Sequence, residues 1–197
     1  MKITIGIPAY NEEKNITPII TKLKKITDSI IVCDDGSSDM TSKISQDLGA
    51  RVVTHEKNMG YGAAIKSIFL EAKQIQPDIL VTFDADGQHN VEDIEKVIVP
   101  IQKSTSDIVI GSRFLNEKNK EIPRYRKVGI KTITGLTNTL TGTKISDAQS
   151  GFRAYSKKTL EKITPSDDGM GVSTEILIKS SKLGLIITEV PIKINYE

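Results

Sequence analysis

Cysteine and histidine are scarce in this sequence of 197 residues, which contains one cysteine and two histidines. A single cysteine, Cys33, cannot form a disulfide within the chain, and the apolar residues before it predict a buried strand position in a cytoplasmic protein. His55 and His89 have no cysteine or histidine at the spacing of zinc ligands, which argues against a zinc site. Without a G-x-S-x-G sequence, a nucleophilic triad also has little support.

Long hydrophobic runs and an excess of one charge are absent as well. No apolar stretch approaches the roughly 18 to 20 residues that a membrane-spanning helix needs. Residues 1–14 lack the apolar core and the small-residue cleavage site of a secretory signal, so we expect that the chain is not exported. The 27 basic residues nearly balance the 25 acidic ones, and this balance argues against general nucleic-acid binding.

The composition is that of an ordinary globular protein, with 38% hydrophobic and 26% charged residues, and the length predicts a single domain over residues 1–197. Short β-branched runs alternate with segments of helical periodicity, which predicts an α/β fold with a mostly parallel central sheet. We expect strands over residues 3–7, 29–33, 51–55, 79–83, 107–110 and 186–194. We expect helices over residues 15–26, 39–48, 60–74, 91–101 and 172–183, a helical stretch ending near residue 141, and a loop over 146–151.

Polar residues gather where three of the expected strands end. They form the segments 8–12, 34–37 and 84–89, which follow the first, second and fourth strands. Ligands of open parallel sheets bind at the edge where the carboxyl ends of the strands meet. The three segments therefore predict one shared ligand site.

The acid pair Asp84 and Asp86 is the most specific chemical signal in these segments. Two carboxylates placed directly after a strand can bind one hard cation if the backbone turns, and Gly87 permits that turn. Mg²⁺ or Mn²⁺ bound in this way completes its shell with substrate phosphates and water, so the pair predicts a phosphate-bearing substrate. The alternative is a solvated acidic turn.

Two further segments allow both a functional and a structural interpretation. Asp34 and Asp35 could accept hydrogen bonds from a nucleobase or a ribose, while the serine and aspartate that follow could cap the next helix. Residues 57–64 place small side chains at a helix start, where backbone N–H groups could approach an anion. The spacing matches neither G-x-G-x-x-G nor G-x-x-x-x-G-K-[ST], which argues against dinucleotide and P-loop sites. His89 could contact substrate or cap the helix that begins near residue 91.

Six motifs follow one another along the chain. They are I-P-A-Y-N-E-E (7–13), D-D-G-S (34–37), N-x-G-x-G-x-A (58–64), D-A-D-G-Q-H (84–89), G-S-R-F (111–114) and S-D-x-Q-S-G-F-R-A (146–154). Their order resembles that of family 2 glycosyltransferases, and they are most similar to the branch of dolichol-phosphate mannose synthases and polyprenyl-phosphate sugar transferases. The resemblance covers about residues 3–192.

The resemblance implies a Rossmann-like GT-A fold that binds a nucleotide sugar, with helices flanking the sheet. It also implies a divalent metal, Mg²⁺ or Mn²⁺, and inversion at the anomeric carbon. Residues 1–111 would form the donor half and residues 112–197 the acceptor half. The family's motifs assign donor binding to Pro8, Ala9, Tyr10, Glu12, Asp35, Gly60, Asp84, Ala85 and Asp86.

The same motifs assign the metal, the chemistry and the acceptor. The metal would be bound by Asp84, Asp86 and Gln88. Catalysis would depend on Asp84, Asp86 and Arg113. The acceptor would be bound by Arg113, Arg126, Gln149 and Arg153.

A basic segment and the chain end bear on the acceptor. Residues 113–131 carry seven basic side chains against two acidic ones, a net charge of +5. Many members of the family carry C-terminal membrane helices, whereas this chain stops at Glu197. We therefore expect either peripheral docking at the cytoplasmic membrane face through the surface around residues 124–131, with a separate membrane subunit possible, or a soluble acceptor. The alternative for the basic segment is a solvated loop and helix face.

The resemblance predicts transfer of a hexose from a nucleotide sugar of the GDP-mannose or UDP-glucose type to a polyprenyl or dolichyl phosphate. A phosphate acceptor is already anionic at neutral pH and needs no general base. A soluble or polysaccharide hydroxyl acceptor would need one, for which Glu175 is the candidate, although an acid in a first helical turn also favours the helix dipole. A third alternative, a catalytically silent subunit that binds nucleotide sugar, is disfavoured by the intact Asp84, Asp86 and Arg113.

Overall fold

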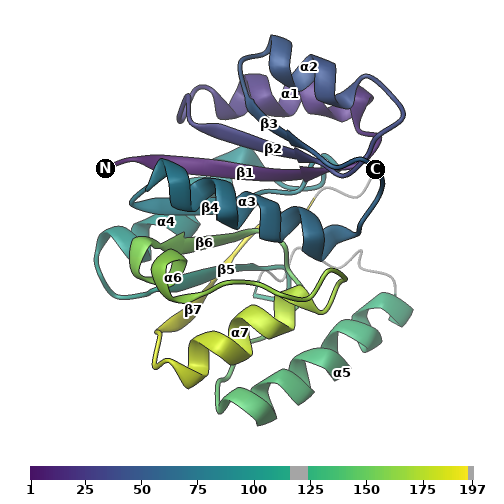
Figure 1. Ribbon diagram of the computed structural model, residues 1–197. Helices are drawn as coiled ribbons and strands as arrows, with labels where there is room; N and C mark the ends of the chain where they lie inside the picture. Colours follow the sequence, from purple (N-terminus) through teal and green to yellow (C-terminus); the bar gives the residue numbers. More distant parts are fainter. Residues whose placement is uncertain (116–123, 195–197) are drawn as a thin grey trace.

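The computed structural model describes residues 1–115 and 124–194, which form a central seven-stranded sheet covered by helices on both faces (Figure 1). The sheet has the order β3-β2-β1-β4-β6-β5-β7, and only β6 runs antiparallel to its neighbours. The strands are β1 (Ile3–Ala9), β2 (Ile30–Asp34), β3 (Arg51–Thr54), β4 (Ile79–Thr82), β5 (Ile108–Ser112), β6 (Arg153–Ser156) and β7 (Ile187–Pro191).

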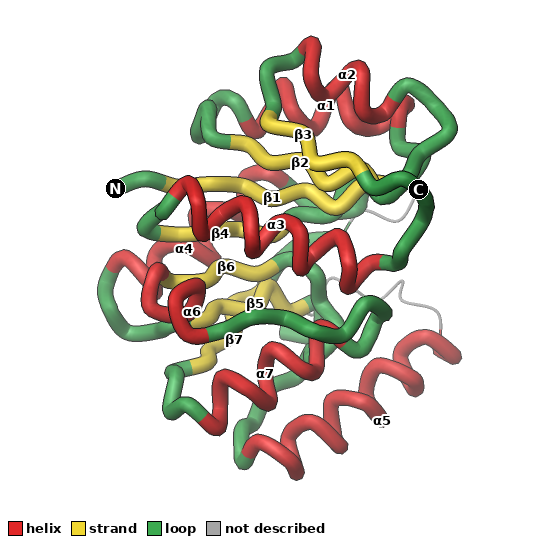
Figure 2. The backbone as a smooth tube through the Cα atoms, viewed as in Figure 1, coloured by secondary structure: helices red, strands yellow, loops and turns green. Residues whose placement is uncertain are grey.

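The helices divide between the two faces of the sheet (Figure 2). The α-helices are α1 (Glu13–Leu23), α2 (Thr41–Asp47), α3 (Tyr61–Ile75), α4 (Ile94–Gln102), α5 (Arg124–Thr141), α6 (Lys157–Lys162) and α7 (Val172–Lys182), and a 3-10 turn, η1 (Val91–Asp93), precedes α4. On one face, α1 and α4 pack against the strands, and on the other face α3, α6 and α7 do so. Helix α5 packs on α7 and lies beyond it from the sheet (Figure 1).

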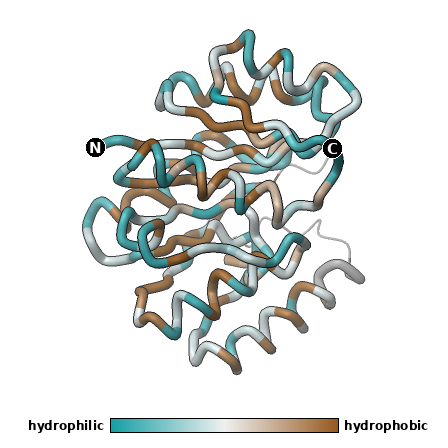
Figure 3. Tube along the Cα trace, in the orientation of Figure 1, coloured by the Kyte–Doolittle hydropathy of each residue, from teal (hydrophilic) through white to brown (hydrophobic). Residues whose placement is uncertain are grey.

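The strands are hydrophobic along most of their length because both of their faces are covered (Figure 3). Every residue of β2, of β4 and of β5 is buried. Close packing of α3 depends on Gly6 in β1, since a Cβ there would overlap the Ile68 side chain. The expected buried strand position of Cys33 is confirmed, with no exposed surface.

The predicted strands and helices are confirmed, but the structure adds one strand and one helix that were not predicted. The six expected strands and the expected helices are present, with ends that differ by a few residues, and the helix expected over 91–101 begins as the turn η1. Strand β6 and helix α6 were not predicted, because β6 is four residues long and has the pattern R-A-Y-S, with polar residues at both ends. The expected mostly parallel α/β sheet is thus confirmed, with one antiparallel strand in its interior.

The region from residue 113 to 131 is described only in part. Lys118, Lys120 and residues up to 123 lie outside the described residues, and the side chain of Arg126, in the first turn of α5, is not described either. Among the described residues, no helix combines the length and the apolar character that crossing a bilayer requires.

Candidate active site

The carboxyl end of β1, residues that follow β1 and β2, and residues before and at the start of α3 line a cavity of about 160 Å³. Its lining consists of Pro8, Ala9, Tyr10, Asp35, Asn58, Gly60, Tyr61 and Ala64. Five of the residues expected to bind the donor therefore share one small cavity at the carboxyl ends of β1 and β2. The register places these two ends together, because Ala9 pairs with Asp34.

Among the described residues that line this cavity, Asp35 is the acidic one, and its carboxylate is held by several donors. Its Oδ2 accepts a hydrogen bond from the Gly60 backbone N–H at 2.8 Å, and its Oδ1 accepts one from the Met59 N–H at 2.9 Å. Nδ1 of His55 lies 2.6 Å from Oδ1. Asp35 is 4% exposed, so these bonds replace most of its contact with water.

The start of α3 differs from the anion site that its small residues suggested. The N–H groups of Met59 and Gly60 bind Asp35, and the Ala63 N–H binds the Asp168 carbonyl at 3.1 Å. Gly60 has a φ of +102°, and a Cβ there would also meet the Asp168 carbonyl oxygen. The N–H groups of Met59 and Gly60 therefore fix the Asp35 carboxylate, and the N–H group of Ala63 binds a carbonyl of the protein.

Glu12 lies beside this cavity but does not line it. Its backbone N–H donates to the Thr41 hydroxyl at 2.8 Å, and its carboxylate accepts from the Asn15 amide at 2.8 Å. Burial raises the pKa of Glu12, the Asn15 hydrogen bond opposes this, and the charges of Asp86 and Asp39 raise it further. The first motif and the acid pair are thus close enough for their charges to interact.

The acid pair follows β4 at the same edge. The Asp84 side chain is 25% exposed, and it accepts a hydrogen bond from the Tyr61 hydroxyl at 3.3 Å. Burial, together with the Asp84 charge, raises the pKa of Tyr61 well above its ordinary value, so the hydroxyl stays protonated and donates. Nε2 of His89 lies 3.3 Å from the other Asp84 oxygen. A Cβ at Gly151 would overlap the Tyr61 hydroxyl and the Asp84 carboxylate, so a larger residue there would displace these side chains.

Asp86 is exposed, and one of its oxygens accepts the backbone N–H of Gln88 at 3.0 Å. The turn between them passes through Gly87, whose φ is +75°. No group of three or more histidine, cysteine or acidic side chains within the described residues is arranged to hold a metal ion. The oxygen donors of Asp84, Asp86 and Gln88 nevertheless fit Mg²⁺ or Mn²⁺, which are commonly held by one or two carboxylates and completed by substrate phosphates and water.

His89 contributes to packing as well as to the acid pair. Its ring contacts Phe83 and Phe152, with ring centroids 5.8 and 5.2 Å away. It does not cap η1, which begins after Asn90. Its position beside Asp84 is therefore the feature that bears on the site.

Arg113, at the end of β5, is bound by Asp147 in a two-pronged ion pair. Nε and Nη2 of Arg113 each lie 2.7 Å from an oxygen of Asp147, whose side chain is fully buried. Glu189 on β7 accepts the N–H groups of Ser146 and Asp147 at 2.7 and 2.9 Å. Burial raises the pKa of Glu189, and the hydrogen bonds from this loop oppose that rise. The loop before β6 is thus anchored to β7 and in turn orients Arg113.

Gln149 and Arg153, also expected to bind the acceptor, differ in their exposure to solvent. Gln149 is partly exposed and donates to the Thr174 hydroxyl of α7 at 3.1 Å. Arg153 is 1% exposed, and its guanidinium donates to the carbonyls of Ser150, Ser173 and Ala148 at 2.7 to 2.9 Å. The assignment of Arg153 to the acceptor site stays a prediction, but its donors hold the loop before β6 inside the protein, which favours a structural role.

Glu175 is held by the loop before α7. Its carboxylate accepts the N–H groups of Ser166 and Asp167 at 3.0 and 2.9 Å and pairs with Lys179 at 2.5 Å. Burial opposes its ionisation, but the hydrogen bonds from Lys179, Ser166 and Asp167 prevail and lower its pKa to about 2. Such a carboxylate is a weak base at neutral pH, so the structural interpretation of Glu175 is favoured.

Several residues of this edge were not singled out from the sequence as site residues. Tyr61 and Asp147 lie inside the quoted motifs, but nothing in the motifs shows that they bind Asp84 and Arg113. His55 ends an expected strand, the position that drew attention to the other polar segments, and this signal could have found it.

Comparison with known proteins agrees with this geometry. Residues 4–164 match the family model described as "Glycosyl transferase family 2". The chain is 39% identical to the UDP-N-acetylglucosamine–dolichyl-phosphate N-acetylglucosaminyltransferase of Methanococcus voltae, over 98% of this chain and 86% of that protein. It is 33% identical to the dolichyl-phosphate hexose transferase of Haloferax volcanii, over 96% of this chain and 81% of that protein.

A solved structure shows a similar fold. Glucosyl-3-phosphoglycerate synthase of Mycobacterium tuberculosis, crystallised with Mn²⁺, UDP and phosphoglyceric acid, superposes with a TM-score of 0.76 at 22% identity, covering 100% of this chain and 71% of that one. The expected GT-A fold is thereby confirmed. From its family match and its two relatives, the chain belongs to glycosyl transferase family 2.

Proposed function

We propose that this chain transfers a sugar from a nucleotide sugar to dolichyl phosphate or another polyprenyl phosphate, with inversion at the anomeric carbon. The observation that carries the proposal is the cavity around Asp35 beside the acid pair Asp84 and Asp86, at one edge of the sheet. Tyr61 joins the two, since it lines the cavity and donates to Asp84. The names of the Methanococcus voltae and Haloferax volcanii relatives support dolichyl phosphate as the acceptor.

The cavity is suited to the nucleoside of the donor. The Asp35 carboxylate offers an acceptor at a fixed position, and Tyr10, which is 48% exposed, offers an aromatic face at the cavity rim. A nucleobase or a ribose presents N–H or O–H donors to such a carboxylate. A hexose nucleotide of the GDP-mannose or UDP-glucose type meets these requirements.

The diphosphate of the donor would lie beside the acid pair. Asp84, Asp86 and Gln88 would hold Mg²⁺ or Mn²⁺, which offsets the negative charge that develops on the departing nucleoside diphosphate. Tyr61 and His89 hold the Asp84 carboxylate from two sides. These contacts keep its oxygens in place while the diphosphate leaves.

The acceptor phosphate would approach from the side of Arg113. A phosphate monoester, with a second pKa of about 6, is already largely ionised at neutral pH. One of its oxygens attacks the anomeric carbon from the face opposite the diphosphate, the bond from that carbon to the diphosphate breaks, and the nucleoside diphosphate leaves with the electron pair. Arg113 orients the attacking phosphate, and Asp147 fixes the orientation of Arg113. The low pKa of Glu175, about 2, is compatible with a reaction that needs no general base.

We also propose a peripheral contact between this chain and the membrane that holds the lipid acceptor, at the cytoplasmic face. Helix α5 carries the exposed apolar side chains Val128, Leu136 and Leu140 together with the exposed Lys131. Apolar and basic side chains on one helix are typical of binding at a bilayer surface. The expected docking surface around residues 124–131 overlaps this helix.

The experiment that tests the function is a transfer assay with a panel of radiolabelled nucleotide sugars, Mn²⁺ or Mg²⁺, and a polyprenyl phosphate. We expect label to move into the organic phase with one class of donor. Label in a water-soluble glycoside instead would identify a soluble acceptor. Tight nucleotide binding without any transfer would identify a silent binding subunit.

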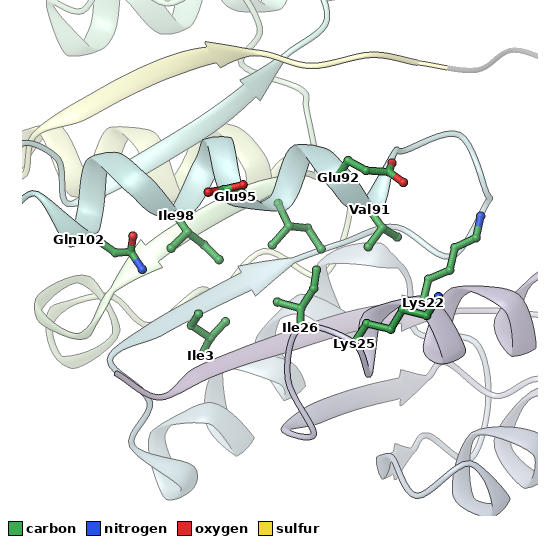
Figure 4. Close-up of a pocket in the computed structure, with 10 residues that line it drawn as sticks. Ile3, Lys22, Lys25, Ile26, Val91, Glu92, Glu95, Ile98 and Gln102 are labelled. Carbon is green, nitrogen blue, oxygen red and sulfur yellow. The ribbon is translucent and has the colours of Figure 1, made fainter.

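A groove elsewhere on the molecule does not compete with this assignment. It has a volume of about 610 Å³ and lies between the end of α1 and the helices η1 and α4 (Figure 4). It adjoins Ile3 at the amino end of β1, whereas the acidic site lies beyond the carboxyl end of that strand. Its lining includes none of the residues that the motifs assign to donor, metal or acceptor.

A further inference from the structure

The imidazole of His55 contacts the carboxylate of Asp35, which lines the cavity assigned to the donor. The register of the sheet produces this contact, because Asp34 in β2 pairs with Thr54 in β3, so Asp35 and His55 leave the sheet side by side. Nδ1 of His55 lies 2.6 Å from Oδ1 of Asp35, and the His55 backbone N–H donates to the Asp34 carbonyl at 2.9 Å. The His55 side chain is 10% exposed and the Asp35 side chain 6%.

The other nitrogen of the ring is also engaged. Nε2 of His55 lies 2.8 Å from the Ser67 hydroxyl on α3 and 3.6 Å from Sγ of Cys33. The ring therefore bridges β2, β3 and α3 immediately behind the cavity. Burial, with the charges of Asp35 and Asp34, raises the pKa of Cys33 to about 12, so the thiol stays protonated and uncharged beside the ring.

We propose that His55 is a positioning residue of the donor site, which holds the Asp35 carboxylate in the orientation that the nucleoside requires. This inference rests on the proposed function and deepens it. With Nδ1 carrying the proton, His55 donates to Oδ1 of Asp35 and leaves Nε2 to accept from the Ser67 hydroxyl. The backbone donors of Met59 and Gly60 approach the same carboxylate from the loop before α3.

Three donors from two segments, His55 after β3 and the loop before α3, fix the plane of this carboxylate. Without His55, the carboxylate keeps the Met59 N–H on Oδ1 and the Gly60 N–H on Oδ2, both from one loop, so its plane is held less firmly about the terminal bond. A buried acceptor that loses its partner also weakens the site around it. The cavity would then present its acidic acceptor at a variable angle, and nucleoside binding would suffer while the acid pair Asp84 and Asp86 keeps its geometry.

The test compares two substitutions of different chemistry at position 55. His55→Leu removes the donor, whereas His55→Asn keeps an N–H donor near the position of Nδ1. Ser45→Ala is the matched control, since it removes a buried hydrogen bond in the same part of the chain, from the Ser45 hydroxyl to the Thr41 carbonyl, without contacting the cavity. Calorimetry with UDP and with GDP, each in the presence of Mn²⁺, gives the dissociation constants.

We expect His55→Leu to raise the dissociation constant of the nucleotide that wild type prefers about tenfold, which corresponds to one hydrogen bond to a charged group. We expect His55→Asn to restore most of that affinity and Ser45→Ala to leave it unchanged. In the transfer assay, His55→Leu should raise KM for the nucleotide sugar by the same factor and change kcat less than about twofold, because the nucleoside contact is equal in ground and transition states.

Wild-type affinity in His55→Leu, or equal loss in His55→Asn and His55→Leu, overturns the inference while the proposed function stands. Wild type that binds neither UDP nor GDP overturns both. A measurement on wild type alone covers the case in which His55→Leu does not fold. In nitrogen NMR spectra we expect the proton of His55 on Nδ1, and a proton confined to Nε2 contradicts the proposed hydrogen bond.

Discussion

The acids Asp35 and Asp84, before residue 112, and the arginines Arg113 and Arg153, after it, are held in opposite ways. Asp35 takes its hydrogen bonds from two backbone N–H groups and an imidazole, and Asp84 takes its own from a tyrosine and a histidine. Arg113 is instead paired with a buried carboxylate, and Arg153 with three backbone carbonyls. The two acids are thus held by hydrogen-bond donors, whereas the two arginines are held by a carboxylate or by carbonyl dipoles.

This difference separates residues that look alike in the sequence. A carboxylate held by neutral donors keeps its negative charge available for a metal or a nucleoside. Arg113 is in an ion pair with a buried carboxylate, which offsets much of its charge. Arg153 donates to interior carbonyls and so stabilises the fold. The contrast therefore predicts which substitutions abolish the reaction and which unfold the protein.

The largest effect on the reaction is expected for Asp86→Asn, which tests the anionic side of the contrast. Asp86 is exposed, so the change should leave folding intact while weakening the hold on the metal and the diphosphate. We expect turnover to fall about 10³-fold, roughly 4 kcal/mol of transition-state stabilisation. Steady-state kinetics measures the effect, with Asp47→Asn, an exposed aspartate of α2 outside the cavity lining, as the control. Undiminished wild-type turnover in EDTA would refute the metal assignment.

Arg153→Met tests whether Arg153 stabilises the fold through its hydrogen bonds to interior carbonyls. The substitution leaves the three carbonyls of Ser150, Ser173 and Ala148 without their donor in the protein interior. At about 1 kcal/mol for each, we expect a loss of about 3 kcal/mol in the free energy of unfolding. Denaturant unfolding measures it against Arg51→Met, whose parent side chain is 56% exposed. Normal stability combined with lost transfer would return Arg153 to the acceptor site.

Arg113→Lys tests whether Arg113, unlike Arg153, contacts the substrate. Lysine cannot reproduce the two-pronged contact with Asp147, and it offers a phosphate only a point charge. We expect transfer to fall about 100-fold, or about 2.7 kcal/mol, with unchanged nucleotide affinity. Transfer kinetics and calorimetry together measure this, with Arg51→Lys as the control. A change in nucleotide affinity alone would place Arg113 on the donor side.

A smaller effect is expected for Asp35→Ala, which removes the acceptor from the cavity. We expect nucleoside diphosphate binding to weaken by about 1 to 3 kcal/mol. Calorimetry with a panel of nucleoside diphosphates measures the loss, and thermal unfolding checks that the fold is retained. Equal affinity of wild type and variant for every nucleotide would contradict the assignment.

The smallest effect on transfer is expected for Glu175→Gln, because a phosphate acceptor needs no base. We expect transfer within about twofold of wild type at neutral pH. The pKa of Glu175 is lowered to about 2 from an ordinary 4.5, so its contribution to stability is present above about pH 4.5 and is lost as the pH falls toward 2. The stability difference between wild type and Glu175→Gln should shrink over that range in pH-dependent unfolding. Collapse of transfer in this variant would favour a hydroxyl acceptor.

The sequence indicated which residues gather at the cavity better than it indicated which residues of the later motifs are buried, for physical reasons. Apolar strands that end in acidic or glycine-rich segments indicate both the strand and the position of its polar end, and Pro8, Tyr10 and Asp35 were found in this way. The family resemblance supplied the role of Gly60, which shares their cavity.

Burial and pairing across the fold are what the sequence could not indicate. The sequence around an arginine in a polar motif does not indicate whether its side chain faces a ligand or the protein interior, and Arg153 proves to be buried. The contact of His55 with Asp35 depends on the register of β2 and β3. The short β6, with two polar residues among its four, gave no strand pattern of its own.

The antiparallel direction of β6 limits the distance between the two charged groups of this site. Because β6 begins at the edge where β4 and β5 end, the residues before it reach both sides, with Asp147 on Arg113 and Gly151 against Asp84. The Gly151 carbonyl is fixed there by the Thr82 hydroxyl at 2.6 Å. Only four residue steps separate Asp147 from Gly151, so their Cα atoms can be at most about 14 Å apart. This short segment therefore keeps Arg113 and Asp84 close together at one edge of the sheet.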